Sequence, residues 1–249
     1  MSRAKVYISH SLGLPDITTQ TLLKQVPCNL LPERLPKVDL RTTVCSRLLL
    51  GHVLAQATGQ SQEDIQLARS AYGRPYLLGE SDTDFNLSHQ GPWCAVGCVQ
   101  DTLRSWGIGV DIVDSTQGND APSRHLDALR PHLTLKEHMD VSGRPSMTDQ
   151  LVQASRIWGA KEAYVKAIGL GLSMALNRLE VTFHPQDNRI TYCLDGQDLH
   201  KCSSQWFLLP RDDVVDPYTL IVALVPISTK TQMGGVDVAE PCFVALMAT

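Results

Sequence analysis

The sequence lacks the features that mark several large classes of protein. Its 22 Lys and Arg against 26 Asp and Glu give a net charge of -4, which argues against general binding of nucleic acid. The seven cysteines are odd in number, and they form no CxxC pair and no Cys/His spacing typical of zinc sites. No apolar run is long enough to span a membrane, and no signal-peptide pattern opens the chain. We therefore expect a cytoplasmic protein from a reducing compartment, with neither membrane nor nucleic acid as partner.

A glycine-rich phosphate loop of the GxxxxGK[ST] kind is also absent, which disfavours a P-loop kinase. Apolar residues make up 43% of the 249 positions, so the chain can build a sizeable core as one large domain or two small ones. Residues 12–38 hold four prolines, and any helix there should be short and broken. Alternating apolar residues predict strands at 4–9, 94–99, 106–113, 179–183, 189–194, 205–209 and 218–226.

Two long helices are predicted, one at 39–58 with Asp39 as N-cap and one at about 149–168 that ends at Gly169. The polar link between the strands at 94–99 and 106–113 suggests that these two strands pair antiparallel. Residues 114–150 look like a long connection, with one short helix that begins after Thr134 as its N-cap. The tail from residue 228 has few structural signals, and we expect it to be mobile or weakly docked.

The second long helix carries a polar face that rises in steps of four residues, Trp158, Glu162 and Lys166. Small and apolar residues such as Ala163 and Ala167 form a second stripe suited to packing on a core. A carboxylate and an ammonium are thus held one turn apart on a rigid element. Taken alone, this pattern is equally compatible with an ordinary surface ion pair.

Two other polar clusters lie in predicted strands. Ser88, His89 and Gln90 end a short alternating run and are followed by glycine, so several hydrogen-bonding groups converge there. Asp111 interrupts the apolar run Gly-Val-Asp-Ile-Val at 109–113, where a buried carboxylate is costly unless it is paired or binds a metal. The alternatives are a structural histidine and an aspartate on the exposed face of its strand.

Asp111 and Glu162 together offer carboxylate oxygens to a hard cation, and Mg²⁺ commonly takes only one or two carboxylates beside water and phosphate. Four basic residues could either be solvated or hold further phosphate, namely Arg41, Arg47, Arg74 and Lys161. This set indicates chemistry on a pyrophosphate, where positioning and charge neutralisation do most of the catalysis.

Four motifs then occur in order: Gly-Arg-Pro (73–75), Asn-x-Ser-His-Gln (86–90), Gly-Val-Asp-Ile (109–112) and Trp-x-x-Lys-Glu-Ala-x-x-Lys-x-x-Gly-x-Gly-Leu (158–172). This order resembles the 4′-phosphopantetheinyl transferases, and specifically their longer single-chain type. The last motif is the specific one. The resemblance implies an α/β (α+β) fold of two similar halves in a pseudo-twofold arrangement. It also implies transfer of phosphopantetheine from coenzyme A to a serine of an apo carrier protein, with Mg²⁺.

Carried over by position, the resemblance implies that Asp111 and Glu162 bind the metal and that Lys166 contacts the pyrophosphate. Glu162 would also take the proton from the carrier serine, since a neutral hydroxyl needs a base within hydrogen-bond reach. His89 and Lys166 complete the implied catalytic set with Glu162. The implied contacts of coenzyme A are Arg41 or Arg47, Arg74, Pro75, Ser88, His89, Lys161 and Lys166.

The sequence departs from the bacterial members of this type at one position, because Val113 stands where they carry a second acid. Asp114 follows directly, and strand alternation turns it to the other face. The next candidate ligand is Gln90, as in the animal and fungal members that the motif resembles, and water could serve instead.

We expect halves at 1–108 and 109–228, a tail at 229–249, and a monomer that docks acyl or peptidyl carriers against residues 114–150. The carrier could belong to fatty-acid, polyketide, nonribosomal-peptide or lysine pathways. The alternatives are another Mg²⁺-dependent phosphotransferase and a non-catalytic coenzyme A-binding protein.

Overall fold

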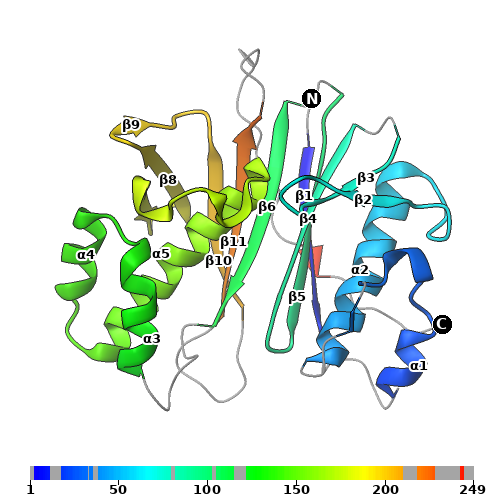
Figure 1. Ribbon diagram of the computed structural model, residues 1–249, viewed down its shortest axis with the longest axis horizontal. Helices are drawn as coiled ribbons and strands as arrows, with labels where there is room; N and C mark the ends of the chain where they lie inside the picture. Colours follow the sequence, from blue (N-terminus) through cyan, green and yellow to red (C-terminus); the bar gives the residue numbers. More distant parts are fainter. Residues whose placement is uncertain are drawn as a thin grey trace.

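The computed structural model has two large β-sheets, each with a long helix on its outer face, and a small sheet of two strands, β2 (Leu67–Arg69) and β3 (Pro75–Leu77) (Figure 1). It describes residues 3–11, 18–32, 34–35, 39–79, 82–102, 105–114, 122–209, 218–227 and 242–243. The first sheet consists, in spatial order, of β12 (Cys242–Phe243), β1 (Arg3–His10), β5 (Trp93–Gln100) and β4 (Thr83–Gln90). The second consists of β6 (Trp106–Val113), β11 (Tyr218–Pro226), β10 (Ser203–Leu209), β8 (Arg189–Leu194) and β7 (Leu179–His184), with β9 (Gln197–Asp198) beside β8.

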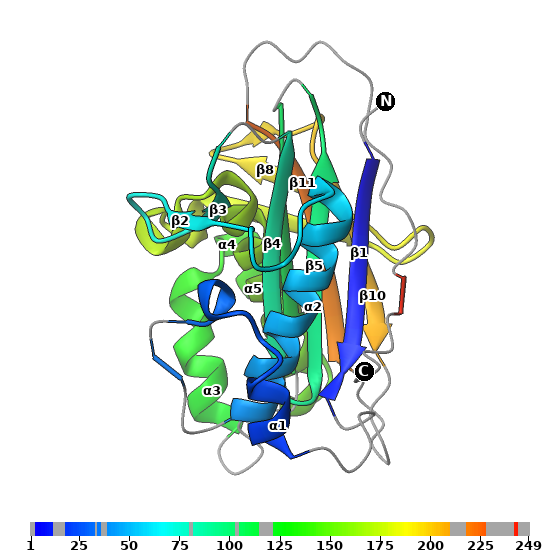
Figure 2. The ribbon, with the colours of Figure 1, turned by 90° about the vertical axis from the view of Figure 1, so that its right-hand side faces the viewer.

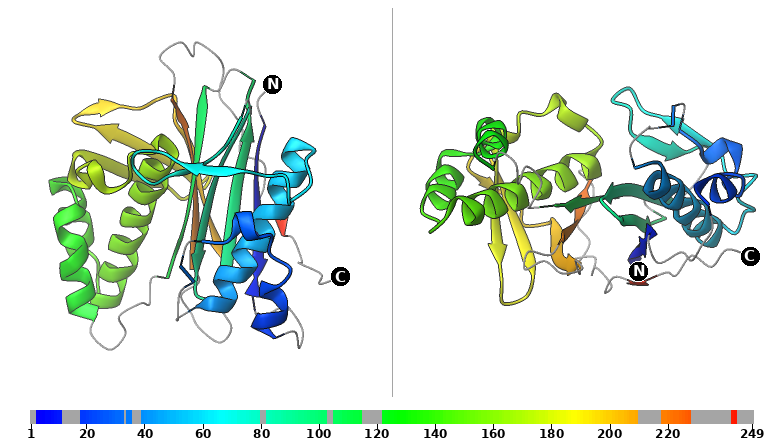
Figure 3. Two further views of the ribbon diagram at one scale, coloured as in Figure 1. Left: turned by 45° about the vertical axis from the view of Figure 1, so that its right-hand side comes forward. Right: turned by 90° about the horizontal axis from the view of Figure 1, so that it is seen from below.

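The long helices α2 (Leu40–Thr58) and α5 (Met147–Ile168) cover the outer faces of the first and second sheet. Figure 2 shows α2 in front of β4 and β5, and the right-hand view of Figure 3 shows both sheets between the helices. A separate inner core joins the sheets, with Val6 and Ile8 of β1 in the same apolar cluster as Val110 of β6. The predicted α/β fold of two similar halves is confirmed. The shorter elements are α1 (Thr19–Leu23), η2 (Cys28–Leu30), β2 (Leu67–Arg69), β3 (Pro75–Leu77), α3 (Pro122–Leu129), η3 (Arg130–His132), α4 (Leu135–Ser142), η4 (Gly171–Ser173) and η5 (Leu176–Arg178).

The predicted antiparallel pair of β5 and β6 is wrong. Both edges of β5 are already taken, because β5 pairs with β1 on one side and β4 on the other, while β6 pairs with β11. The chain between them therefore crosses from one sheet to the other. Gly97 of β5 faces β6, and an added Cβ there would lie 2.7 Å from Val110 and 2.8 Å from Ile108.

The free edge of β6 meets side chains of β4 instead of another backbone. Alternate residues of a strand point to the same face, so three β4 side chains face β6 at two-residue intervals. We call this set the side-chain ladder. Its bonds run from Ile108 N to Asp84 Oδ2 (2.8 Å), from Val110 N to Asn86 Oδ1 (2.9 Å) and from Ile112 N to Ser88 Oγ (3.2 Å).

The segment predicted as a long connection, 114–150, holds the helices α3 and α4 among its described residues. The prediction missed α3 because its apolar face is short, with Leu126 and Leu129 as its buried residues. The predicted cap Thr134 is confirmed, and Glu137 completes a capping box at the start of α4. Asp39 does precede α2, but it adopts a left-handed backbone conformation with φ 59° and its carboxylate does not cap the helix.

The predicted C-terminal end of α5 at Gly169 is confirmed, and a φ of 76° at this residue closes the helix. The helix begins after Ser146, close to the start predicted at about 149. None of the described helices is long and apolar enough to cross a membrane. The expectation of a mobile tail falls outside the described residues, apart from Cys242–Phe243, which pair parallel to β1.

Candidate active site

The site lies where α5 packs unusually closely on β6. An added Cβ at Gly109 would lie 1.9 Å from the carbonyl oxygen of Ala163, and one at Gly107 would lie 2.3 Å from that of Ala167. Glycine on the strand and alanine on the helix therefore let the two backbones approach. This contact sets the carboxylate of Asp111 on β6 beside the polar face of α5.

Asp111 is buried, and only one of its two carboxylate oxygens is satisfied by protein groups. Its Oδ1 accepts hydrogen bonds from Lys166 Nζ (2.5 Å) and Ser88 Oγ (3.1 Å). Its Oδ2 is buried and has no hydrogen-bond partner among the described residues. Lys166 also donates to the carbonyl oxygen of Val110 at 3.2 Å. The aspartate, the lysine and the serine predicted from separate motifs thus meet at one point.

Glu162 lies beside this carboxylate, one turn before Lys166. Its Oε1 is buried without a partner in the described part of the chain. Burial raises the pKa of Glu162, the negative charge of Asp111 raises it further, and the Lys166 ammonium partly offsets both. Gly159, one turn earlier, has no room for a side chain, because its Cβ would lie 2.2 Å from Val113 and 3.3 Å from Asp111 Oδ2.

Two unpaired carboxylate oxygens in a buried position are costly for the apo protein, and they suit a divalent cation. The set is small: no cluster of three or more His, Cys, Asp or Glu side chains exists among the residues described. Val113, the position without an acid, is buried in the core behind α5. Gln90 ends β4 on the face of Ser88, two residues further along, and is half-buried. A hard cation that keeps water or phosphate ligands fits this arrangement better than a metal that needs a protein cage.

His89 alternates with Ser88 and Gln90, and it belongs to a second, cationic part of the site. The His89 side chain is exposed at its outer side, but partial desolvation lowers its pKa; the charge of Arg47 lowers it further, Asp39 raises it, and Lys166 lowers it. Burial and the neighbouring Arg69 lower the pKa of Arg47, whose Nε is buried without a partner in the described chain. Cationic and imidazole groups collected in this way would suit an anion.

This arrangement distinguishes the two candidate arginines of α2. Arg47 lies near His89, whereas Arg41 is turned to the start of the helix, where its Nε donates to the carbonyl oxygen of Ser11. Arg69 was missed by the sequence analysis. The sequence did contain a signal for it, because Arg69 stands shortly before the Gly-Arg-Pro motif. In the structure, Arg69 lies in the same hairpin, and its Nη1 donates to the carbonyl oxygen of Gly73.

The structure contradicts the expected phosphate contact of Lys161. This side chain is 0% exposed, and its Nζ donates to Glu137 Oε2 (2.5 Å) and to the carbonyl oxygen of His132 (2.8 Å). The reason is helical phase: Lys161 is about 100° around α5 from Glu162 and faces α4 instead of β4.

The guanidinium of Arg74, another residue expected to contact phosphate, is turned inward, and its Nε is buried without a partner among the described residues. Its Nη2 donates to Asp84 Oδ2 at 2.7 Å and to the carbonyl oxygen of Ile108 at 3.0 Å, and its Nη1 donates to that of Ala167 at 3.0 Å. Pro75 begins β3 directly after it and is half-buried.

Comparison with known proteins gives a consistent result for both halves. The family model described as the 4′-phosphopantetheinyl transferase superfamily matches residues 107–222. The model described as 4′-phosphopantetheinyl transferase, N-terminal, matches residues 32–100. The two models together include α2, the β2–β3 hairpin, β4, β6 and α5, which carry the residues described above.

Single relatives agree with the family models. A putative 4′-phosphopantetheinyl transferase of Haemophilus influenzae is 32% identical over 187 residues, which cover 70% of this chain and 74% of the relative. The L-aminoadipate-semialdehyde dehydrogenase-phosphopantetheinyl transferases of Pongo abelii and Xenopus laevis are 30% and 29% identical over 153 residues, 59% of this chain. The match spans about half the length of these two animal relatives, 48% and 49%. On the family models and the Haemophilus relative together, this chain belongs to the 4′-phosphopantetheinyl transferase superfamily.

Proposed function

We propose that this protein transfers the 4′-phosphopantetheine group of coenzyme A to a serine of an acyl or peptidyl carrier protein, with Mg²⁺ as cofactor. The carrier serine Oγ would form a bond to the β-phosphorus of coenzyme A. The bond from that phosphorus to the bridging oxygen of the diphosphate would break, and adenosine 3′,5′-bisphosphate would leave with that oxygen.

The observation that carries the proposal is the pair of unpaired buried oxygens, Asp111 Oδ2 and Glu162 Oε1, beside the Lys166 ammonium. These two acids would hold Mg²⁺, with Gln90 or water as a further ligand. The bound ion would supply neutralisation of the diphosphate charge. Lys166, whose ammonium lies beside Asp111, would contact the leaving phosphate and balance its charge.

Glu162 has the environment that a general base requires. Without a metal, burial and the charge of Asp111 raise its pKa above the ordinary value for glutamate, and a bound cation would oppose this rise and keep the carboxylate ionised, as a proton acceptor must be. It would accept the proton of the serine hydroxyl as the new P–O bond forms. His89, Ser88, Arg47 and the newly recognised Arg69 would hold the phosphates of coenzyme A at the end of β4 and in the β2–β3 hairpin.

The proposal extends to organisation and partners. Two halves, expected to meet at 108/109 but here divided before β6 so that this strand lies whole in the second half, would hold coenzyme A between them in a monomer, with residues 229–249 as a tail. The carrier would dock beside the site against residues 114–150, in the region of α3 and α4. A carrier from fatty-acid, polyketide, nonribosomal-peptide or lysine metabolism would serve equally well in this chemistry.

The test is to mix the protein with coenzyme A, Mg²⁺ and a panel of apo carriers and to measure the intact mass of each carrier. We expect one phosphopantetheine mass to be added, with adenosine 3′,5′-bisphosphate as the second product. A different nucleotide product would point to another phosphotransferase. Binding of coenzyme A without any added mass, and without change in Glu162→Ala, would point to a non-catalytic binding protein.

A further inference from the structure

Arg74 connects three elements that lie far apart in the sequence. It sits between β2 and β3, in the hairpin that reaches from the first half towards the end of α5 (Figure 3, left). Its guanidinium is bound to Asp84 on β4, to the Ile108 carbonyl on β6 and to the Ala167 carbonyl on α5. The side chains of Arg74 and Asp84 are only 16% and 23% exposed. One arginine therefore fastens both sheets and the outer helix of the second half.

Asp84 completes this connection from the other side. Its Oδ2 accepts both from Arg74 (2.7 Å) and from the backbone N–H of Ile108 (2.8 Å), which is the first bond of the side-chain ladder. The N–H and the carbonyl oxygen of Ile108 are thus both satisfied by one ion pair of the first half. Backbone groups at a sheet edge need such partners when they are buried.

The bonded carbonyls are close in sequence to the proposed reacting groups. Ala167 directly follows Lys166, and Ile108 lies three residues before Asp111. Gly169, which ends α5, lies against the Arg74 side chain, since a Cβ there would be 3.1 Å from Arg74 Cδ. The position of Arg74 therefore determines where the strand of Asp111 and the helix of Lys166 stand relative to Ser88 and His89 on β4.

We propose that Arg74 and Asp84 form a positioning pair that fixes the two halves at the separation the reaction needs, and that Arg74 is not a ligand of a substrate phosphate. This inference rests on the proposed transfer reaction. The charge of Arg74 is already balanced by Asp84, and the donors of its Nη2 are taken by protein oxygens. A phosphate at Nη1 or Nη2 would have to displace these bonds, whereas Arg47 donates no hydrogen bond to the described residues that a phosphate would have to break. The Nε atoms of both arginines are buried without a partner among those residues, so the contrast lies in the Nη groups.

Four variants separate positioning from phosphate binding: Arg74→Ala and Asp84→Asn, with Arg178→Ala and Asp195→Asn as matched controls. Arg178 and Asp195 form another Arg–Asp pair, but both side chains are about half exposed on the surface of the second half. The measurements are the Kd of coenzyme A by calorimetry, and kcat and KM for transfer to an apo carrier. Hydrogen exchange of the amides of β6 gives a readout that does not require activity.

For a positioning pair, we expect Arg74→Ala and Asp84→Asn to act alike. Both should lower kcat by roughly 10- to 100-fold, as expected when reacting groups are misplaced by about 1 Å, with less than about threefold change in the Kd of coenzyme A. Exchange of the Ile108, Val110 and Ile112 amides should speed up in both variants and in neither control.

Phosphate binding predicts the opposite pattern. Arg74→Ala would then weaken coenzyme A binding by tenfold or more, and Asp84→Asn, which frees the guanidinium, would keep or tighten it. That result, or unchanged exchange of the β6 amides, would overturn the inference. If the wild-type protein does not transfer phosphopantetheine, the proposed function fails. The exchange data then still decide whether the pair holds the two halves together.

Discussion

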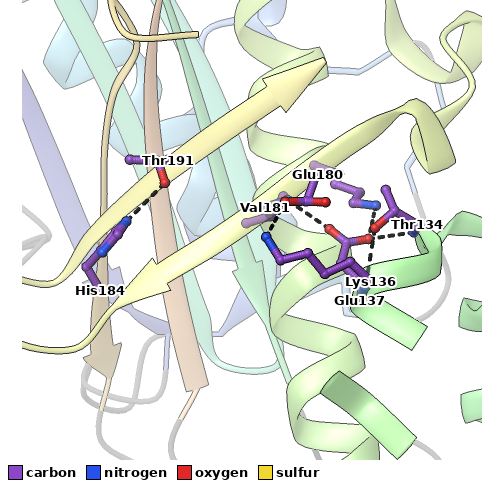
Figure 4. A network of polar contacts seen from close by, with 8 residues as sticks. Thr134, Lys136, Glu137, Glu180, Val181, His184 and Thr191 are labelled. Carbon is purple, nitrogen blue, oxygen red and sulfur yellow. Dashed lines mark hydrogen bonds and ion pairs between the residues drawn. The ribbon is translucent and has the colours of Figure 1, made fainter. Parts of the chain in front are cut away.

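Two lysines of α5 each hold a buried carboxylate, and the two ion pairs differ in what is left unsatisfied. Lys161 binds Glu137, whose Oε2 also accepts from Thr134 N (2.7 Å) and whose Oε1 accepts from Val181 N (2.8 Å), as Figure 4 shows around the start of α4. Lys166 binds Asp111 Oδ1, whereas Asp111 Oδ2 and Glu162 Oε1 have no hydrogen-bond partner in the part of the chain that the structure describes. Both pairs join a lysine of α5 to a buried carboxylate, although Lys166 is 27% exposed and Lys161 is 0% exposed. The difference that bears on function lies in the remaining carboxylate oxygens.

A structural acid and a candidate functional acid therefore differ in whether each carboxylate oxygen is hydrogen-bonded. Glu137 joins α4, α5 and β7 and has no oxygen left for a ligand. Asp111 and Glu162 each keep a carboxylate oxygen that accepts no hydrogen bond from the described residues, and leaving it unpaired lowers the stability of the folded protein. The predictions below test this difference, beginning with the variants that should change the measured quantity most.

The largest effect is expected from Glu162→Gln and Asp111→Asn, which keep the shape but remove the negative charge. Transfer to an apo carrier should fall by roughly 10²- to 10⁴-fold, the range for loss of a general base. Intact-mass kinetics measure this change, and circular dichroism checks the fold. Asp195→Asn, at the surface, is the control and should retain full activity. Full activity of Glu162→Gln would remove the distinction between the two acid sites.

Lys161→Met should mainly change stability, because it leaves Glu137 buried without its cation. The free energy of unfolding should fall by about 3–5 kcal/mol, as for other buried ion pairs from which one partner is removed. Chemical denaturation measures it, and Lys136→Met is the control, since the Lys136–Glu180 pair is exposed on the lysine side and should contribute about 0–1 kcal/mol. Loss of coenzyme A binding by well-folded Lys161→Met would instead support the original expectation of a phosphate contact.

Gly109→Ala should disturb the contact between α5 and β6. The positions of Asp111 and Glu162 in the candidate active site depend on this contact. A Cβ only 1.9 Å from the Ala163 carbonyl oxygen must push the helix away, and overpacking of this kind costs about 1–3 kcal/mol. We expect a lower midpoint in thermal unfolding together with slower transfer. Gly143→Ala, where the nearest atom is 3.3 Å away at the end of α4, should change neither. Equal behaviour of the two variants would show that the close approach is not needed.

The smallest effect concerns pH in the absence of metal. The folded-state pKa of Glu162 is raised, so the folded protein holds this proton to higher pH than the unfolded chain does, and stability falls as pH rises through the folded pKa. Glu162→Gln stays neutral and should unfold about 2–4 °C higher than wild type near pH 8, which corresponds to about 1 kcal/mol in a chain of this size. Added Mg²⁺ should stabilise the wild type only. Equal unfolding midpoints of the wild type and Glu162→Gln at pH 8 would contradict the raised pKa of Glu162 in the folded protein.

The fold and the meeting of Asp111 with Lys166 could largely be predicted from the sequence. The period of α5, its end at Gly169 and the apolar run around Asp111 are local patterns, and local patterns survive in the folded state. The motif order then linked the strand to the helix. By contrast, the pairing of β5 with β6 was predicted wrongly because pairing depends on which edges are free, and the sequence does not show that β5 lies between β1 and β4.

The directions of Lys161 and Arg74 could not be predicted for a related reason. Lys161 is one residue from Glu162, and its burial depends on Glu137, which is 24 residues away in a segment that looked like a connection. Arg74 reaches the carbonyl of Ala167, 93 residues later. A basic residue in a glycine-proline turn has the same sequence signature whether it faces a phosphate or a carboxylate.

The side-chain ladder has a consequence for the second half as an independent unit. Strand β6 forms the border of its sheet, and its amide groups on that border are paired by Asp84, Asn86 and Ser88 of the first half. Expressed without the first half, residues 105–227 would expose this border as an open template for a strand of another copy, the usual origin of intermolecular β-association. In the intact protein, the first half covers this border of β6 and so protects the second half from such association. Three short polar side chains, instead of continuous backbone pairing, bridge the two sheets here, and this keeps open the space in which we propose that the reaction occurs.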